Sequence, residues 1–107
     1  MPLSRLDALK QFVEKSPGDP FPRYGLAMEL KSQGRLDEAH AAFVEMEQRF
    51  PDYVAQYLMH CNVLAALKRK DDAKAVGARG VEAARRKGDN HALGELQAAL
   101  DGLDYEE

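Results

Sequence analysis

The feature that most constrains this chain is a sequence repeat with a period of about 34 residues. When the sequence is shifted against itself by that length, residues of similar size and polarity coincide. The coinciding pairs are Tyr24 and Leu58, Ala27 and Cys61, Leu30 and Leu64, Ala39 and Ala73, and Pro17 and Pro51. A fixed period of this order is typical of proteins built from stacked units. Because one such unit cannot bury its own apolar face, its neighbours must cover that face.

The composition indicates which element the repeat is built from. Ala occurs 16 times and Leu 13 times among 107 residues, Ile, Thr and Trp are absent, and Val is the only β-branched type. Ala and Leu favour helices, whereas β-branched residues favour strands. A content of 31% charged and 45% hydrophobic residues excludes a disordered chain. We therefore expect one all-α domain spanning residues 1–107, with a single modest core.

Turn-forming residues divide the chain into six segments of helix length. Ser4 and Asp7 form a capping pair at the first start, Gly34 supplies the left-handed residue that ends the second helix, and Asp52 is available to cap the fourth. The fourth segment is apolar at so many positions that it is predicted to be central. The expected helices cover residues 4–15, 21–33, 36–49, 53–67, 71–86 and 90–103.

Two glycines interrupt the fifth of these segments. Gly77 and Gly80 each weaken a helix by roughly 1 kcal/mol relative to Ala. Glycines three residues apart also let another helix approach closely. We expect them to mark a second unit that is either degraded or built to receive something at close range.

Charge is unevenly distributed although the formal net charge is only -3. Residues 68–87 hold eight basic and three acidic side chains, and residues 88–107 hold six acidic and no basic ones. The acidic end, residues 101–107, is expected either to cover the basic stretch or to fray. No stretch is apolar enough for a membrane span and the start lacks a signal-peptide pattern, so we predict a cytoplasmic protein that does not contact a membrane.

At these positions the sequence resembles the tetratricopeptide repeat family, in its small bacterial type, whose unit is two antiparallel helices in about 34 residues. Residues 20–53 match best, with Leu26, Ala27, Leu30, Ala39, Phe43 and Pro51 at the family's positions. Residues 54–87 form a degenerate repeat, residues 1–19 look like the second half of a leading repeat, and residues 88–107 like a capping helix with an acidic tail. The resemblance implies a short right-handed α-solenoid of stacked helix pairs.

The resemblance also implies where function lies, because in that family the first helix of each unit lines a concave groove that holds a peptide. By helical phase, Asn62 would bond to a peptide backbone and Lys31 to an acidic group, above an apolar floor. For Tyr24, Met28 and Leu58, plain packing against neighbouring helices is an equally open alternative. The whole predicted groove consists of Phe21, Tyr24, Met28, Lys31, Ala55, Leu58, Asn62, Ala65, Ala92 and Leu96.

Two further observations concern the role of Phe21 and the kind of ligand that this predicted groove would bind. Phe21 lies between two prolines, so the alternative for it is a hydrophobic staple on the helix start. Some family members bind C-terminal carboxylates through paired Lys, Asn and Arg side chains. Tyr24 and Leu58 stand where the anchoring Lys would be, so we do not expect that specificity.

No arrangement of side chains in the sequence indicates catalysis. The three serines, Ser4, Ser16 and Ser32, lie near expected helix ends, where capping explains them. Cys61 belongs to the expected core, and its neighbour His60 points about 100° away from it, so the two do not make a metal site. The other histidines lack metal-ligand spacing, and no phosphate-binding loop is present. We expect no enzyme, cofactor or metal.

These observations predict a non-enzymatic protein–protein interaction module, in an adaptor or scaffold role, that binds a peptide or protein segment in the apolar groove. One alternative is a homodimer that closes the same face on a second copy. Another is nucleic acid or an acidic partner bound by residues 68–87. Aromatic side chains that would stack on bases are absent from that stretch, which disfavours nucleic acid.

Overall fold

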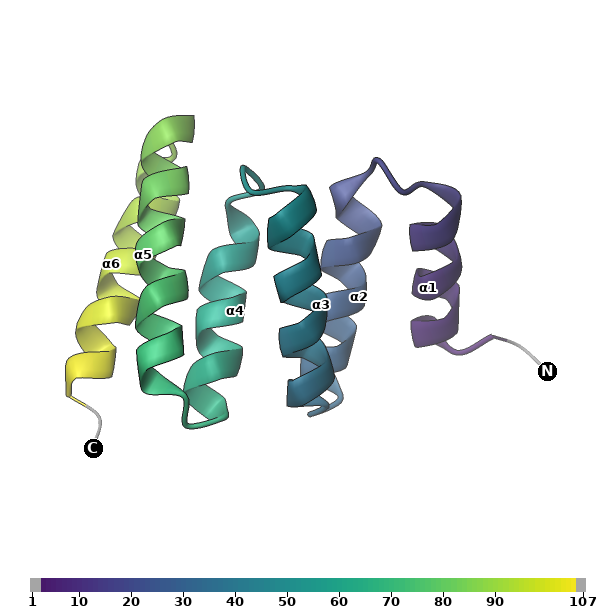
Figure 1. The fold of residues 1–107 in the computed structure, drawn as a ribbon, viewed down its shortest axis with the longest axis horizontal. Coiled ribbons are helices and arrows are strands. Elements are labelled where there is room, and N and C mark those ends of the chain that lie inside the picture. The colour runs from purple at the N-terminus through teal and green to yellow at the C-terminus, as the bar shows by residue number, and fades with distance from the viewer. Residues whose placement is uncertain (1–2, 106–107) are drawn as a thin grey trace.

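The computed structural model describes residues 3–105, and within that range the regular structure consists of six α-helices. Neighbouring helices run antiparallel and follow one another along a molecule of 46 × 31 × 20 Å (Figure 1). Each helix packs on its neighbours in the chain, and α4 also contacts α2 and α6. The predicted stack of helix pairs is therefore confirmed. The helices are α1 (Arg5–Lys15), α2 (Pro20–Ser32), α3 (Leu36–Arg49), α4 (Ala55–Ala66), α5 (Lys70–Lys87) and α6 (Asn90–Asp104).

The helix ends follow local sequence chemistry at most positions. The Oγ of Ser4 accepts a hydrogen bond from the Asp7 N–H at 3.1 Å, and Gly34, with φ of 75°, lies just after α2, both as predicted. The prediction that Asp52 caps α4 is wrong. A turn after Pro51 delays the start of α4 to Ala55, with no side-chain cap. Asp52 forms an ion pair with Arg86 of α5 instead.

Two apolar clusters form the core, one in each half of the stack. The first cluster lies among α1, α2 and α3 and takes Val63 from α4; its buried members are Leu6, Ala27, Leu30, Ala39, Phe43 and Val63. The second lies among α4, α5 and α6 and consists of Tyr57, Cys61, Leu64, Ala73, Val76, Ala83, Ala84, Leu96 and Leu103. Because α4 contributes to both clusters, its predicted central position is confirmed.

The two glycines of α5 lie where helices come close together. Gly77 is buried against Leu100 of α6, and Gly80 is buried against Tyr57 of α4 and Leu96 of α6. The close approach predicted for them is therefore present inside the molecule. Across the described range, every helix is too short or too polar to serve as a membrane span.

Candidate interaction surface

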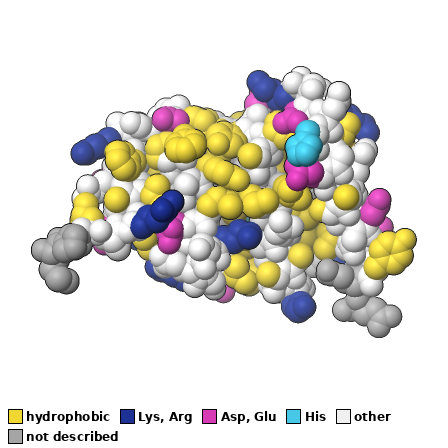
Figure 2. All heavy atoms as spheres, turned by 180° about the vertical axis from the view of Figure 1, so that it is seen from behind, with side chains coloured by type: hydrophobic (Ala, Val, Ile, Leu, Met, Phe, Trp, Pro, Cys, Tyr) yellow, Lys and Arg dark blue, Asp and Glu magenta, His cyan; other side chains and the backbone are white. Residues whose placement is uncertain are grey.

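One face of the molecule is formed by the first helix of each pair, α2 and α4, together with α6. Figure 2 shows that hydrophobic side chains gather in a band across the middle of this face. Two hollows lie in it, and Tyr24 lines both of them. Surface concavities lined by apolar groups are typical of binding sites in general.

The central hollow lies where α2, α4 and α6 meet and has a volume of about 210 Å³. It brings together five of the ten side chains predicted for the groove, contributed by all three helices. Glu95 is its one charged lining residue, and Oε1 of Glu95 lies 3.3 Å from Nε2 of His91. The complete lining is Tyr24, Val54, Ala55, Leu58, Met59, Ala92, Glu95 and Leu96. The sequence did not predict Val54, Met59 and Glu95.

The outer hollow lies on α2 beside α1 and has a volume of about 500 Å³. Three predicted groove residues line it, Phe21, Tyr24 and Met28, together with Gly25, Ser32 and the ion pair of Arg5 and Glu29. Phe21 is 70% exposed. A side chain that exposed is not a packed staple on the helix start, so this alternative is excluded.

Tyr24 joins the two hollows and is held in place by Tyr53. Their rings stack with centroids 5.2 Å apart and an angle of 28° between planes. Partial burial, followed by the proximity of Tyr53, raises the pKa of Tyr24, so its hydroxyl stays protonated at neutral pH. Within residues 3–105 that hydroxyl makes no hydrogen bond, which leaves it free to donate one to a partner.

The remaining predicted groove residues lie outside the two hollows. Asn62 is exposed, Ala65 is half-buried, and Lys31 is half-buried without an ion pair to any described residue. Leu96, expected in the apolar floor of the groove, lines the central hollow and is only 1% exposed. It belongs to the second cluster and forms the floor beneath the central hollow.

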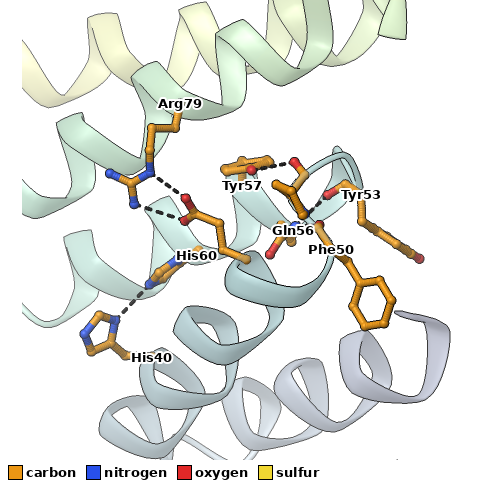
Figure 3. A network of polar contacts seen from close by, with 9 residues as sticks. His40, Phe50, Tyr53, Gln56, Tyr57, His60 and Arg79 are labelled. Atoms are coloured by element: carbon orange, nitrogen blue, oxygen red, sulfur yellow. Dashed lines mark hydrogen bonds and ion pairs between the residues drawn. The ribbon is translucent and has the colours of Figure 1, made fainter. Parts of the chain in front are cut away.

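A set of polar contacts lies between the two apolar clusters, on α3, α4 and α5 (Figure 3). Gln56, which is 1% exposed, donates through Nε2 to the carbonyl oxygens of Phe50 and Tyr53. Tyr57 donates its hydroxyl to the carbonyl of Pro51 at 2.6 Å. These bonds fix the α3–α4 connection against α4. We call the set the polar layer; its side chains are His40, Glu47, Gln56, Tyr57, His60 and Arg79.

The centre of the polar layer is a pair of imidazoles. His40 Nδ1 lies 2.8 Å from His60 Nε2, and the ring of Phe43 stacks on His60. Burial, and then the proximity of His40, lowers the pKa of His60 to about 4, and burial also lowers that of His40. At neutral pH the pair is therefore uncharged. Arg79 meets Glu47 beside it through two hydrogen bonds, of 2.6 and 3.0 Å.

The sequence did not predict the histidine pair, because His60 was weighed against its neighbour Cys61 and His40 lies on another expected helix without metal-ligand spacing. A usable signal was present in the spacing. His40 and His60 are each ten residues from Phe50, at the turn between two antiparallel helices, and positions equally far from such a turn lie side by side.

Neither a metal-binding cluster nor a reactive thiol is found among the described residues. In residues 3–105 no group of three or more His, Cys, Asp or Glu side chains is arranged to hold a metal ion. Cys61 is buried, as predicted, and burial raises the pKa of its thiol, which disfavours the reactive thiolate.

At least half of the basic side chains in the basic stretch, residues 68–87, form ion pairs with acidic groups of the same chain. Lys74 Nζ lies 2.7 Å from Asp104 Oδ1, so part of the acidic end does reach this stretch. Glu106 and Glu107 lie outside the described residues. The ion pairs are Arg69 with Asp72, Lys74 with Asp104, Arg79 with Glu47, and Arg86 with Asp52. This engagement reduces the positive charge available to a nucleic acid.

Comparison with known proteins gives structural matches. The crystal structure of a tetratricopeptide repeat domain protein from Salinibacter ruber is 38% identical to this chain, with a TM-score of 0.78 over 83% of this chain and 100% of the other. A solution structure of a tetratricopeptide repeat domain protein from the same organism is also 38% identical, with a TM-score of 0.80 over 85% and 92%.

A further solution structure, of a protein from Bordetella parapertussis, shares the fold with 18% identity and a TM-score of 0.82 over 96% of this chain and 90% of the other. No protein-family model matches the chain, and no curated protein matches it.

Proposed function

The chain belongs to the tetratricopeptide repeat family, whose members act in general as protein–protein interaction modules, and we propose that it binds a peptide or protein segment across the two hollows. The observation that supports this proposal is that both hollows open on one apolar face and share Tyr24. A bound segment would bury this face, and each apolar side chain it inserts contributes roughly 1.5–3 kcal/mol before the losses of freedom on binding.

The polar groups of the face would orient the segment. The free hydroxyl of Tyr24 would donate to a backbone carbonyl at the junction of the hollows. Lys31 and Asn62, beyond the hollows, would meet an acidic group and a backbone amide. The ten predicted groove residues are retained in this proposal, with Leu96 as floor and with Val54, Met59 and Glu95 added to the wall.

We further propose that the module acts by binding alone, as an adaptor or scaffold. The titratable side chains gathered in the polar layer bond to one another, His40 to His60 and Glu47 to Arg79. None of these four lines either hollow. The cytoplasmic location expected from the sequence stays a prediction.

A second copy of the chain is the alternative occupant, favoured by the 70% exposure of Phe21 at the edge of the same face. Sedimentation velocity over a wide range of concentrations separates the two cases. A module for other proteins stays monomeric, whereas a homodimer forms as concentration rises, and Phe21→Ala would abolish it.

Selection of peptides from a displayed library on the intact chain tests the proposal. The selected peptides should bind the double variant Tyr24→Ala with Leu58→Ala at least about tenfold more weakly than the unaltered chain, because both hollows lose a wall. Val44→Ala is the matched control, since Val44 is an exposed hydrophobic residue on α3 and lines a different hollow. Unchanged binding to the double variant, equal loss in the control, or a library without binders would each contradict the proposal.

A further inference from the structure

The polar layer lies where the two halves of the stack meet; each half has an apolar cluster, and α4 contributes to both. His40 lies on α3, which packs in the first cluster, and His60 lies on α4 beside Cys61 of the second cluster. Figure 3 shows the two imidazoles pointing toward one another across the gap between these helices. Phe43, a member of the first cluster, stacks on His60 with ring centroids 5.3 Å apart. The pair is thus a polar contact placed directly at the joint between α3 and α4.

The number of protons on the pair decides whether this contact can exist. With no added proton, one of the facing nitrogens carries hydrogen and the other accepts it. One added proton settles on His40, the more exposed ring, and its Nδ1–H still donates to His60 Nε2. A second proton leaves two N–H groups facing each other at 2.8 Å, with no acceptor between them. His60 is 2% exposed, so water cannot solvate its charge while the joint is closed.

We propose that the His40–His60 pair makes the α3–α4 joint a proton-operated hinge, which stays closed with one added proton and opens when the second is bound. Opening separates α4 from α3 and withdraws Val63 of α4 from the first cluster, while the second cluster stays intact within its own half. The hinge does not depend on the proposed binding function. It would affect the central hollow, because Tyr24 lines that hollow from the first half and Leu58 from the second.

Charged groups around the pair also affect the pKa values of the two histidines, in opposing directions. On α3, Asp37 raises the pKa of His40 and Glu47 raises that of His60. From the start of α5, Arg69 lowers both, and Asp72 raises that of His40. Arg79 of α5 lowers that of His60.

Most of these charges already bond to one another, Arg69 to Asp72 and Arg79 to Glu47, so their effects on the pair partly cancel. Burial is the largest cause of the lowered pKa at both histidines. Opening the joint removes that burial and lets both rings take up protons. The pair titrates as a coupled unit, and acid shifts it toward the open form.

Distance measurements between the two halves test the hinge in the full chain. Spin labels on Gln11→Cys of α1 and Gln97→Cys of α6 occupy exposed positions at opposite ends of the stack, and the buried Cys61 stays unlabelled at neutral pH. Between about pH 7 and about pH 4.5 the open fraction should rise on the order of tenfold or more, seen as a longer and broader distance distribution. Far-UV circular dichroism on the same samples should show unchanged helix content.

Variants of the histidines identify the cause. In His40→Gln the amide oxygen at position 40 can accept a hydrogen bond from the protonated His60, so the joint should open only at a lower pH than in the unaltered chain. His60→Gln removes the buried titrating group and should stay closed in acid, which keeps the test valid if one variant fails to fold. His91→Gln is the matched control, because His91 is exposed on α6, and it should open as the unaltered chain does.

The proposal is overturned by a distance distribution that does not change in acid. It is equally overturned if His40→Gln opens at the same pH as the unaltered chain, or if opening occurs only together with loss of helix content.

Discussion

A Cβ atom built on Gly80 would lie 2.5 Å from the Cβ of Tyr57, closer than real Cβ contacts come. The Tyr57 Cβ is attached directly to the backbone of α4 and cannot turn aside. On the other side, the same added atom would lie 3.0 Å from Cδ2 of Leu96. Glycine at this position therefore sets how closely α5 packs against both α4 and α6.

Replacing glycines of the second half by alanine should distinguish the energetic cost of overpacking from the gain in helix propensity. Gly80→Ala should lower the free energy of unfolding by about 2 kcal/mol, because overpacking outweighs the gain in propensity. At Gly77 an added Cβ meets the end of the flexible Leu100 side chain at 2.7 Å, so Gly77→Ala should change stability by less than about 1 kcal/mol. Urea denaturation followed by circular dichroism measures both.

Gly94 provides the matched control for this series. It lies in α6 with nothing within 4 Å of its added Cβ, so Gly94→Ala should stabilise the protein by up to about 1 kcal/mol. If Gly80→Ala were as stable as Gly94→Ala, the close contact with Tyr57 would have no energetic significance.

Tyr57 should make the protein sensitive to alkali. Burial is the main cause that raises its pKa to about 12, above the ordinary value of 10.0. Below pH 10 the hydroxyl is protonated in both folded and unfolded chains, and as pH rises from 10 to 12 only the unfolded chain releases the proton. This side chain should therefore lower the free energy of unfolding over that window, by about 1.4 kcal/mol at about pH 11.

Tyr57→Phe isolates this effect from other groups that titrate in alkali. At pH 8 the variant should be about 1 kcal/mol less stable than the unaltered chain, because the hydrogen bond to the Pro51 carbonyl is lost. By about pH 11 that difference should disappear. A difference that stays constant between the two pH values would mean that the hydroxyl is not buried.

Nucleic acid should not bind at the basic stretch, residues 68–87. Four of its eight basic side chains already form ion pairs with acidic groups of the chain. Fluorescence anisotropy with labelled single and double strands at low ionic strength should show no binding. A salt-dependent increase in anisotropy would contradict this expectation, because electrostatic binding to phosphates weakens as salt is added.

Local sequence chemistry made part of this structure predictable. The sequence repeat and the helix-forming composition specify paired helices, and Ser4 and Gly34 specify two helix ends through bonds within a few residues of themselves. Such features depend on neighbours in the sequence. For the same reason the helix boundaries agree with the structure within two residues, with α4 as the largest shift at its start.

Features that depend on contacts between distant helices were less predictable. Helical phase predicted Leu96 in the apolar floor of the groove, but its near-complete burial depends on how closely α6 approaches α5 at Gly80. The His40–His60 contact needed the α3–α4 pairing as well as the two residue types. Asp52 carried a capping signal, yet its carboxylate pairs with Arg86 near the far end of α5.

The most direct test of the proposed binding face is an NMR map of a selected peptide on the intact chain. The largest amide shift changes should cluster on α2, α4 and the start of α6, around Tyr24, Leu58 and Ala92, which line the central hollow. Changes that cluster instead on the outer sides of α3 and α5, around Val44 and Arg79, would show that partners bind elsewhere and would contradict the account.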